Sequence, residues 1–180
     1  MEVVNSTCTL KLSSKLDLEN LAQSPFVAKP KRTRRPRKTE KFKVVVWKNN
    51  GVTYLLYANG KCVMLGCRSL QDMYEASQWI KKILSMESKE LFTVHNVVGT
   101  FKIDRDINFR EFSETLRAIR KDYGYFEPEL TPALVYHPRC SPKATCLIFR
   151  TGRVIMTGVV SFRILNQMYT EIFELIKSFY

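Results

Sequence analysis

The sequence repeats itself once, at a spacing of 92 residues. TYLLYANGKCVMLGCRS (53–69) aligns with TCLIFRTGRVIMTGVVS (145–161), with six identical positions and several conservative ones. A duplicated unit constrains the architecture more firmly than local propensity, because both copies must fold in the same way. Gly60 and Gly152 fall at equivalent hairpin turns, where a positive φ is expected. We predict two tandem units, residues 1–90 and residues 91–180.

Each copy predicts the order strand, helix, three strands, helix. In the first copy, alternating apolar residues predict four strands, at 3–12, 43–48, 52–58 and 61–67. Helices are predicted at 16–22 and 69–84, and the counterpart of the short helix at 107–121. Hairpin strands with all helices on one side predict an α+β fold, in which an antiparallel sheet has one covered face. The other face is left for binding.

The long helix of each copy has an apolar stripe that is typical of core packing. The first helix is expected to bury Leu70, Met73, Tyr74, Ser77, Ile80 and Leu84. The second is expected to bury Leu165, Met168, Tyr169, Ile172 and Ile176. Met73 and Tyr74 match Met168 and Tyr169 at an offset of 95, so the spacing of the copies is expected to drift slightly.

The chain is strongly basic, with 29 Lys and Arg against 17 Asp and Glu and a net charge of +12. Such a charge indicates a polyanionic partner, either nucleic acid or an anionic membrane surface. Most of the excess lies in the loop 29–43, which has nine cations and one acid. Its KPKRTRRPRK stretch fits a nuclear-import signal or a solvated charge run.

Several other classes of protein are not supported by the sequence. There is no signal-peptide pattern and no run of 18 apolar residues, so we expect a protein that is neither secreted nor membrane-spanning. The five cysteines are an odd number, which favours reduced thiols over a disulfide framework. Their spacing does not fit a zinc site. Neither a nucleophile with a base nor a phosphate-binding glycine loop is present, so we predict no enzyme and no cofactor.

Three motifs and the repeat resemble the carboxy-terminal core of the TATA-box-binding protein (TBP) family. The motifs are NSTCTLKLSSKLDLENLA (5–22), YFEPELTPALVY (125–136) and LIFRTGRVIMTG (147–158). The resemblance spans essentially the whole chain. It implies a saddle, in which one curved ten-stranded antiparallel sheet carries four helices on its convex face. It also implies a nuclear protein whose concave face binds the DNA minor groove and whose convex face meets other transcription factors.

The resemblance further implies which residues contact DNA. Asn5 and Asn96 match the family's paired central asparagines, whose amides donate to minor-groove acceptors. The apolar floor and the wedge region match Thr7, Phe42, Lys43, Leu55, Tyr57, Val63, Leu65, Val98, Pro132, Leu147, Phe149, Ile155 and Thr157. Phosphate contacts at the rim are expected from Lys41, Lys48, Lys61, Arg68 and Arg153. Without the resemblance, sheet packing alone would explain the strand residues.

The chain departs from the family at the side chains that wedge between base pairs. The family kinks DNA with two pairs of phenylalanines, of which Phe42 and Phe149 remain, while Tyr57 and Thr131 occupy the other two positions. A threonine is too short to enter a base step. Two further differences point the same way, at Lys43 and Leu65, and Thr7 stands where the second copy has the apolar Val98. We therefore expect weak TATA preference, as in a divergent TBP-related or TBP-like factor.

The loops imply protein partners. Glu127, Glu129 and Leu130 match the second stirrup loop, where the family docks transcription factor IIB. The first loop is the basic stretch, with Arg34 and Pro36 where the family has other contacts, so transcription factor IIA stays an open partner. The leading hypothesis is a nuclear, non-enzymatic factor that contacts promoter DNA and nucleates RNA polymerase II preinitiation complexes. Two alternatives remain: a protein-interaction module that no longer bends DNA, and a true TATA-box binder.

Overall fold

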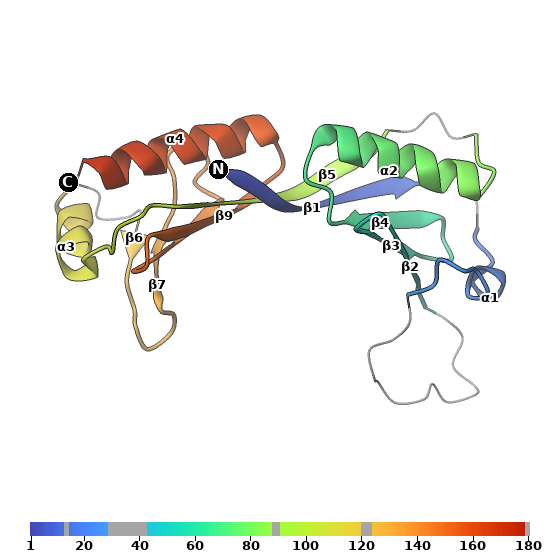
Figure 1. Ribbon diagram of the computed structural model, residues 1–180, viewed down its shortest axis with the longest axis horizontal. Helices are drawn as coiled ribbons and strands as arrows, with labels where there is room; N and C mark the ends of the chain where they lie inside the picture. Colours follow the sequence, from blue (N-terminus) through green and yellow to red (C-terminus); the bar gives the residue numbers. More distant parts are fainter. Residues whose placement is uncertain (13–14, 29–42, 88–90, 120–123, 179–180) are drawn as a thin grey trace. The chain divides into compact units, whose positions relative to one another are not determined.

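The computed structural model describes residues 1–12, 15–28, 43–87, 91–119 and 124–178. The first half of the chain forms β1 (Glu2–Lys11), α1 (Leu18–Leu21), β2 (Val45–Asn49), β3 (Val52–Leu56), β4 (Lys61–Leu65) and α2 (Leu70–Ile83). The second half forms β5 (Thr93–Lys102), α3 (Phe109–Ile119), β6 (Gly124–Tyr125), β7 (Ala133–Tyr136), β8 (Thr145–Phe149), β9 (Arg153–Val159) and α4 (Phe162–Lys177). Figure 1 shows these elements along the chain.

Internal contacts divide the chain into two compact units. The first unit is residues 6–95, and the second unit is residues 1–5 together with 96–180. The start of β1 therefore belongs to the second unit, although it precedes the first unit in sequence. The boundary predicted after residue 90 falls at the edge of residues 88–90, which lie outside the described residues.

The described strands follow the order β2-β3-β4-β1-β5-β9-β8-β7-β6. The pairs β2–β3, β3–β4 and β1–β4 of the first unit are antiparallel, as are β5–β9, β8–β9, β7–β8 and β6–β7 of the second. The described residues thus form nine strands, one fewer than the ten that the family resemblance implied. The first unit has no described strand equivalent to β6 of the second unit. At that place Val27 makes a single antiparallel bridge to Trp47. Two backbone bonds flank this bridge, too few to define a strand.

Each half-sheet has one face covered by helix, as predicted. In Figure 1, α2 covers one face of the first unit's strands and α4 covers one face of the second unit's strands. Burial alternates accordingly: Leu10, Tyr54 and Met64 are buried, whereas their neighbours on the opposite side are half-buried or exposed. This alternation is the two-residue period of a strand with one packed face. We call the side opposite the helices the outer face of each unit.

The buried stripe of α2 differs from the prediction. Leu70 and Tyr74 were expected in the core, but they are 56% and 49% exposed. The reason is register: Ser69 caps α2 and Ser161 caps α4, so the 92-residue spacing continues through the helices. Met73 is then equivalent to the buried Leu165, not to Met168. The predicted drift to an offset of 95 is therefore wrong.

The N-terminus of α2 is closed by a reciprocal cap. The Asp72 backbone N–H donates to Ser69 Oγ at 3.0 Å, and the Ser69 hydroxyl donates to the Asp72 carboxylate at 2.6 Å. A second carboxylate oxygen accepts the Arg68 backbone N–H at 2.9 Å. The Ser69 hydroxyl, followed by the Arg68 N–H, holds the pKa of Asp72 below its ordinary value. A carboxylate here also lies favourably near the positive end of the helix dipole.

We expect Asp72→Asn to destabilise the protein by about 0.5–1 kcal/mol at neutral pH. Because the folded-state pKa of Asp72 is lowered, the ionised carboxylate stabilises the fold above the unfolded-state pKa. This contribution disappears as the pH falls through the folded-state pKa. Urea unfolding should show Asp72→Asn to be less stable than wild type at pH 7 and equally stable at about pH 2.5. Glu75→Gln, on the same helix but outside the cap, controls for the loss of one charge.

Candidate nucleic-acid interface

The outer face of the first unit brings together residues from three strands. On this face Leu65 of β4 lies opposite Thr7 of β1 and Thr53 of β3. In the next row, Val63 lies opposite Leu55 of β3. All five side chains are half-buried, because no helix covers them and neighbouring strands shield only their sides. The result is an apolar surface with two hydroxyl groups.

The outer face of the second unit has the equivalent arrangement. Ile155 of β9 lies opposite Leu147 of β8 and Thr100 of β5, and Thr157 lies opposite Thr145. These side chains are again half-buried, as is Val98. An irregularity between Val97 and Gly99 shifts the pairing of β5 with β9. The predicted floor residues of each unit therefore share that unit's outer face.

The two predicted asparagines differ in exposure and in what surrounds them. Asn96 Oδ1 accepts the Gly158 backbone N–H at 2.9 Å, and Asn96 Nδ2 lies 3.2 Å from Thr157 Oγ1. The bond from Gly158 fixes the side-chain oxygen, and the amide nitrogen donates one of its two N–H groups to the Thr157 hydroxyl. Asn5 is exposed, and the first copy has Leu65, without a hydroxyl, at the position equivalent to Thr157.

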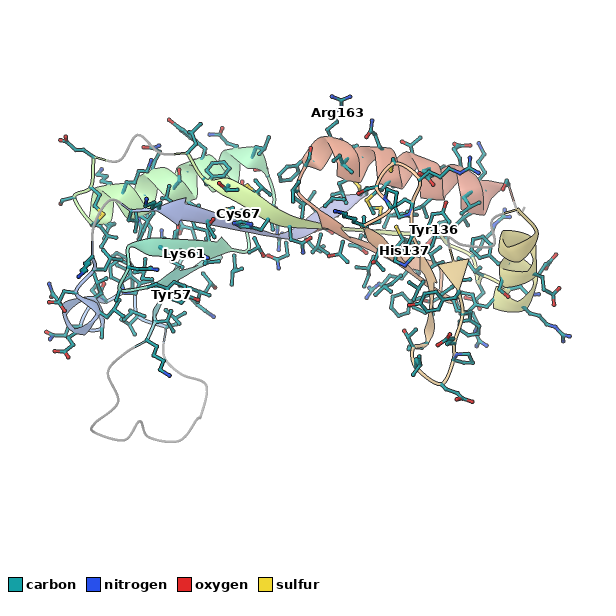
Figure 2. The ribbon with its side chains drawn as sticks, turned by 180° about the vertical axis from the view of Figure 1, so that it is seen from behind. Tyr57, Lys61, Cys67, Tyr136, His137 and Arg163 are labelled. Carbon is teal, nitrogen blue, oxygen red and sulfur yellow. The ribbon has the colours of Figure 1, made fainter. Side chains whose placement is uncertain are left out.

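Two aromatic side chains occupy predicted wedge positions at the ends of hairpin strands. Tyr57 directly follows β3, and its N–H donates to the Lys61 carbonyl at 3.0 Å. Phe149 ends β8, and both rings are half-buried. Figure 2 labels Tyr57, just after β3, and Lys61, at the start of β4. Phe42 lies outside the described residues, and Lys43 is exposed.

The fourth wedge position, Thr131, lies in the loop between β6 and β7. Its hydroxyl accepts the Ala133 backbone N–H at 3.3 Å, which ties the side chain to its own loop. Pro132, next to it, is exposed. The structure therefore places a short side chain with a local hydrogen bond where the family resemblance implies an aromatic wedge.

The charges of the strands favour a polyanion on the outer faces. Within the described strands there are five cationic side chains and one acid, Glu2. The cations are exposed and alternate with buried neighbours, so all five lie on the outer faces: Lys11, Lys48, Lys61, Lys102 and Arg153. Sequence reasoning missed Lys11 and Lys102. Their identity at equivalent positions of the two copies, 91 residues apart, is the signal that could have revealed them.

The predicted partner-binding residues lie in the same loop as Thr131. Glu127, Glu129 and Leu130 are exposed, and Leu130 is 78% exposed. A turn supports the loop, because the Leu130 and Thr131 backbone N–H groups both donate to the Glu127 carbonyl at 3.0 Å. Lys41, Arg34 and Pro36 of the basic loop lie outside the described residues. Arg68 is exposed.

Cys62 and Cys140 have raised thiol pKa values, and both histidines are hydrogen-bonded within the protein. All five cysteines are free, and burial raises the pKa of Cys62 to about 12. Burial, followed by the Glu171 carboxylate, raises the pKa of Cys140 to about 11. Protonated thiols of this kind are poor nucleophiles. His95 is hydrogen-bonded to Thr9, and His137, labelled in Figure 2, to the Ala144 carbonyl.

Metal sites and membrane-spanning helices are absent from the described part of the chain. Its residues contain no cluster of three His, Cys, Asp or Glu side chains that could hold a metal ion. Among the helices described, none has the length and apolar character needed to cross a membrane.

Comparison with known proteins places the chain in a family. The family described as "Transcription factor TFIID (or TATA-binding protein, TBP)" matches residues 1–86 and 91–179. The chain belongs to the TATA-box-binding protein family. The two matched segments account for nearly the whole chain, one segment for each copy of the repeat. Members of this family are non-enzymatic DNA-binding transcription factors, so the prediction that the chain is not an enzyme is confirmed.

Individual relatives and a solved structure support the assignment to this family. TATA-box-binding protein 2 of Entamoeba histolytica is 31% identical over 183 residues, covering 97% of this chain and 80% of the relative. TATA-box-binding protein of Spodoptera frugiperda is 28% identical, covering 99% of this chain and 56% of the relative. The structure of Methanococcus jannaschii TBP matches with a TM-score of 0.72 and 25% identity over 98% of each chain. The predicted fold class is therefore confirmed, with nine described strands rather than ten.

Proposed function

We propose that this chain is a TBP-related initiation factor that contacts promoter DNA in the minor groove and nucleates RNA polymerase II preinitiation complexes. The observation that carries the proposal is the outer face of each unit. In both units it presents half-buried apolar side chains in register, together with exposed cations. Membership of a family of DNA-binding proteins supports DNA as the ligand of this surface.

The chemistry of the outer faces suits a minor groove at A·T pairs. Such a groove presents acceptors on both strands, and only G·C pairs add an amino group. The amide nitrogen of Asn96 is oriented as a donor by the bond from Gly158. Leu147 and Ile155, or Leu55 and Val63, offer flat apolar contact that would exclude a guanine amino group. Exposed lysines at the strand ends would meet phosphates, which position the protein without specifying sequence.

We further propose that TATA preference and sharp bending are weak. Wedging trades a few kcal/mol of unstacking per base step for contact with bent DNA. Thr131 is short and bonded to its own loop, so Phe149 would lack an aromatic neighbour in its pair. Tyr57 brings a hydroxyl that needs a partner when the ring is inserted between bases. These departures support a divergent TBP-like factor.

The partner proposal rests on the exposed loop before β7. Glu127, Glu129 and Leu130 are accessible and include two acids and one apolar side chain. We propose this loop as the contact for transcription factor IIB, with the nucleus as the site of action. A contact with transcription factor IIA stays open, because the corresponding basic loop lies outside the described residues. The two units are proposed to act as one DNA-binding module.

A bending assay across a salt series tests the function. We expect duplexes with and without a TATA box to bind with similar, salt-sensitive affinity and with a modest bend. Sharp bending with strong TATA preference would instead identify a true TATA-box binder. No binding to either duplex, even at low salt, would identify a protein-interaction module. The three hypotheses are thus separated by one set of measurements.

Phe149→Ala tests the remaining wedge directly. We expect the variant to lose about 1–3 kcal/mol of DNA binding, a drop of roughly 5- to 150-fold, because it removes one aromatic contact with a base. Fluorescence anisotropy with a labelled duplex measures the change. Tyr74→Ala, which removes an exposed ring from α2, is the matched control and should bind normally. Unchanged binding by Phe149→Ala would show that the wedge assignment is wrong.

A further inference from the structure

We propose that Lys11 and Lys102 each bind an additional DNA phosphate, and that they do so as members of two like-charged pairs. Lys11 of β1 lies directly opposite Lys61 of β4, and Lys102 of β5 lies directly opposite Arg153 of β9. The inference rests on the proposed function. It adds residues that neither the motifs nor the family resemblance indicated, and it gives them a specific ligand chemistry.

The pair in the first unit lies in a hollow without a carboxylate. Lys11, the last residue of β1, and Lys61, the first of β4, line this hollow of about 250 Å³ with Thr9, Leu10 and Asn59. Asn59 Oδ1 accepts the Lys61 backbone N–H at 3.1 Å, which fixes the turn below the pair. Among the described residues, neither lysine forms a salt bridge. Two ammonium groups therefore share one hollow without a described counter-charge.

Such a pair is unfavourable in the free protein. Like charges directly opposite each other on antiparallel strands destabilise a sheet. A neutral residue at either position would avoid this repulsion. The same arrangement nevertheless recurs at the equivalent place in the second unit. Both pairs lie on the outer face, two residues along the strands from the rows that hold Val63 and Ile155. An anion that bridges each pair would remove the repulsion, and DNA on the outer face supplies phosphates along its backbone.

The two pairs differ in their neighbours. Lys102 Nζ lies 3.8 Å from the Asp104 carboxylate, although both side chains are highly exposed. Glu2 and Lys102 also line the same hollow beside Arg153. Nearby carboxylates compete with a phosphate, since an exposed ion pair already neutralises part of the charge. The first-unit pair should therefore bind phosphate more strongly than the second-unit pair.

The experiment measures DNA affinity of the full chain against salt concentration. The variants are Lys11→Gln, Lys102→Gln and the double variant, with duplexes that contain or lack a TATA box. Loss of one phosphate contact should lower the slope of log affinity against log salt by about 0.9. A salt increase from about 50 to 200 mM would then weaken the Lys11→Gln complex about 3.5-fold less than the wild-type complex. Lys102→Gln should show a smaller change of the same sign on both duplexes.

Two controls separate this effect from misfolding and from total charge. Lys82→Gln removes an exposed lysine from α2, on the helical side, and should leave the slope unchanged. Lys11→Arg keeps the cation and should keep the slope. Thermal unfolding without DNA should show Lys11→Gln to be at least as stable as wild type, because the repulsion is gone. A lower melting temperature that accompanies weaker binding would overturn the proposal in favour of a structural role.

The remaining outcomes are decisive in different ways. If wild type binds DNA and Lys11→Gln keeps the wild-type salt slope, the phosphate proposal is wrong and the proposed function stands. If the Lys82→Gln control lowers the slope as much as Lys11→Gln, net charge rather than the cross-strand pair is responsible, and the proposal again fails. If wild type binds neither duplex, the proposed function fails and this inference fails with it.

Discussion

Thr131→Phe, combined with Tyr57→Phe, is expected to raise affinity for a TATA duplex by about 10-fold or more and to increase the DNA bend. Each inserted ring stacks on a base with about 1–3 kcal/mol of binding energy. The bend also brings more protein surface into contact with the groove. If weak wedging is what limits TATA binding, adding the ring at position 131 and removing the hydroxyl at position 57 should together have a large effect on affinity.

Thr131→Phe removes one side-chain hydrogen bond from the loop before β7. Thr131 is half-buried, and its hydroxyl accepts a long hydrogen bond of 3.3 Å from the Ala133 N–H. Loss of that bond costs about 0.5–1.5 kcal/mol. Ala133 pairs with Phe149 across β7 and β8, so a ring two residues earlier lies near the remaining wedge. Tyr57→Phe removes only a hydroxyl, which would otherwise be desolvated on insertion.

The bend angle, measured by energy transfer between dyes at the duplex ends, tests this expectation alongside affinity. Leu130→Phe is the matched control, because it places a ring in the same loop at a side chain that is 78% exposed. It should change neither quantity. If the double variant binds and bends as wild type does, the wedge positions do not limit TATA binding. Weak wedging would then be the wrong explanation of weak TATA preference.

Gly152→Ala is expected to destabilise the second unit by about 3 kcal/mol or more. Gly152 has φ of +78°, a conformation that costs a side-chain-bearing residue about 1–2 kcal/mol. A Cβ atom at this position would also collide with the Ile103 carbonyl oxygen and lie 2.6 Å from the Arg105 carbonyl oxygen. Both obstacles are backbone atoms of the segment after β5, so a side-chain rotation cannot relieve the clash. The expected loss therefore exceeds the conformational cost alone.

Gly51→Ala separates the two contributions. Gly51 has nearly the same φ, +79°, but nothing lies within 4 Å of the point that an alanine Cβ atom would occupy. It should lose only the conformational cost, about 1–2 kcal/mol. Urea unfolding of the two variants and wild type measures both losses. Equal losses would show that the contact with Ile103 and Arg105 is relieved by backbone movement and contributes little.

Much of the fold could be predicted because it depends on short-range patterns. Alternation with a period of two identified the strands and separated Leu55 and Val63 from the buried Tyr54 and Met64. Gly60 and Gly152 adopt the positive φ that their hairpin turns predicted, +81° and +78°. The cap of α2 was also predictable, since Ser69 and Asp72 are three residues apart.

The prediction was less accurate wherever alignment of the two copies was ambiguous. Matching Met73 and Tyr74 to Met168 and Tyr169 used identical residues, yet the caps impose the 92-residue spacing and leave Tyr74 exposed. The strand count differs for another reason. Val27 has the bridge to Trp47 that a further strand would need, but pairing does not extend beyond it in the described residues.

The candidate site was also predictable from the sequence only in part. The repeat and the family motifs indicated Asn96, Phe149 and the apolar floor from sequence alone. They did not indicate Lys11, because its significance depends on Lys61, a partner 50 residues away in the chain. The recurrence of a lysine in both copies could have drawn attention to it, but only strand register shows that a second cation lies opposite each one. The bond between Asn96 and Gly158 likewise required the tertiary structure.

By itself, the sequence determined the duplication, the order of strands and helices in the first unit, the turns and the side of each strand that faces the core. These properties follow from local periodicity, from backbone conformation at glycine and from the chemistry of helix caps. The second unit has one strand more than predicted, β6. Only the tertiary structure decided the register of α2, the single bridge beside Trp47 and the pairing of like charges on the outer faces. Those properties depend on which distant residues lie opposite one another, and strand register and core packing set that choice.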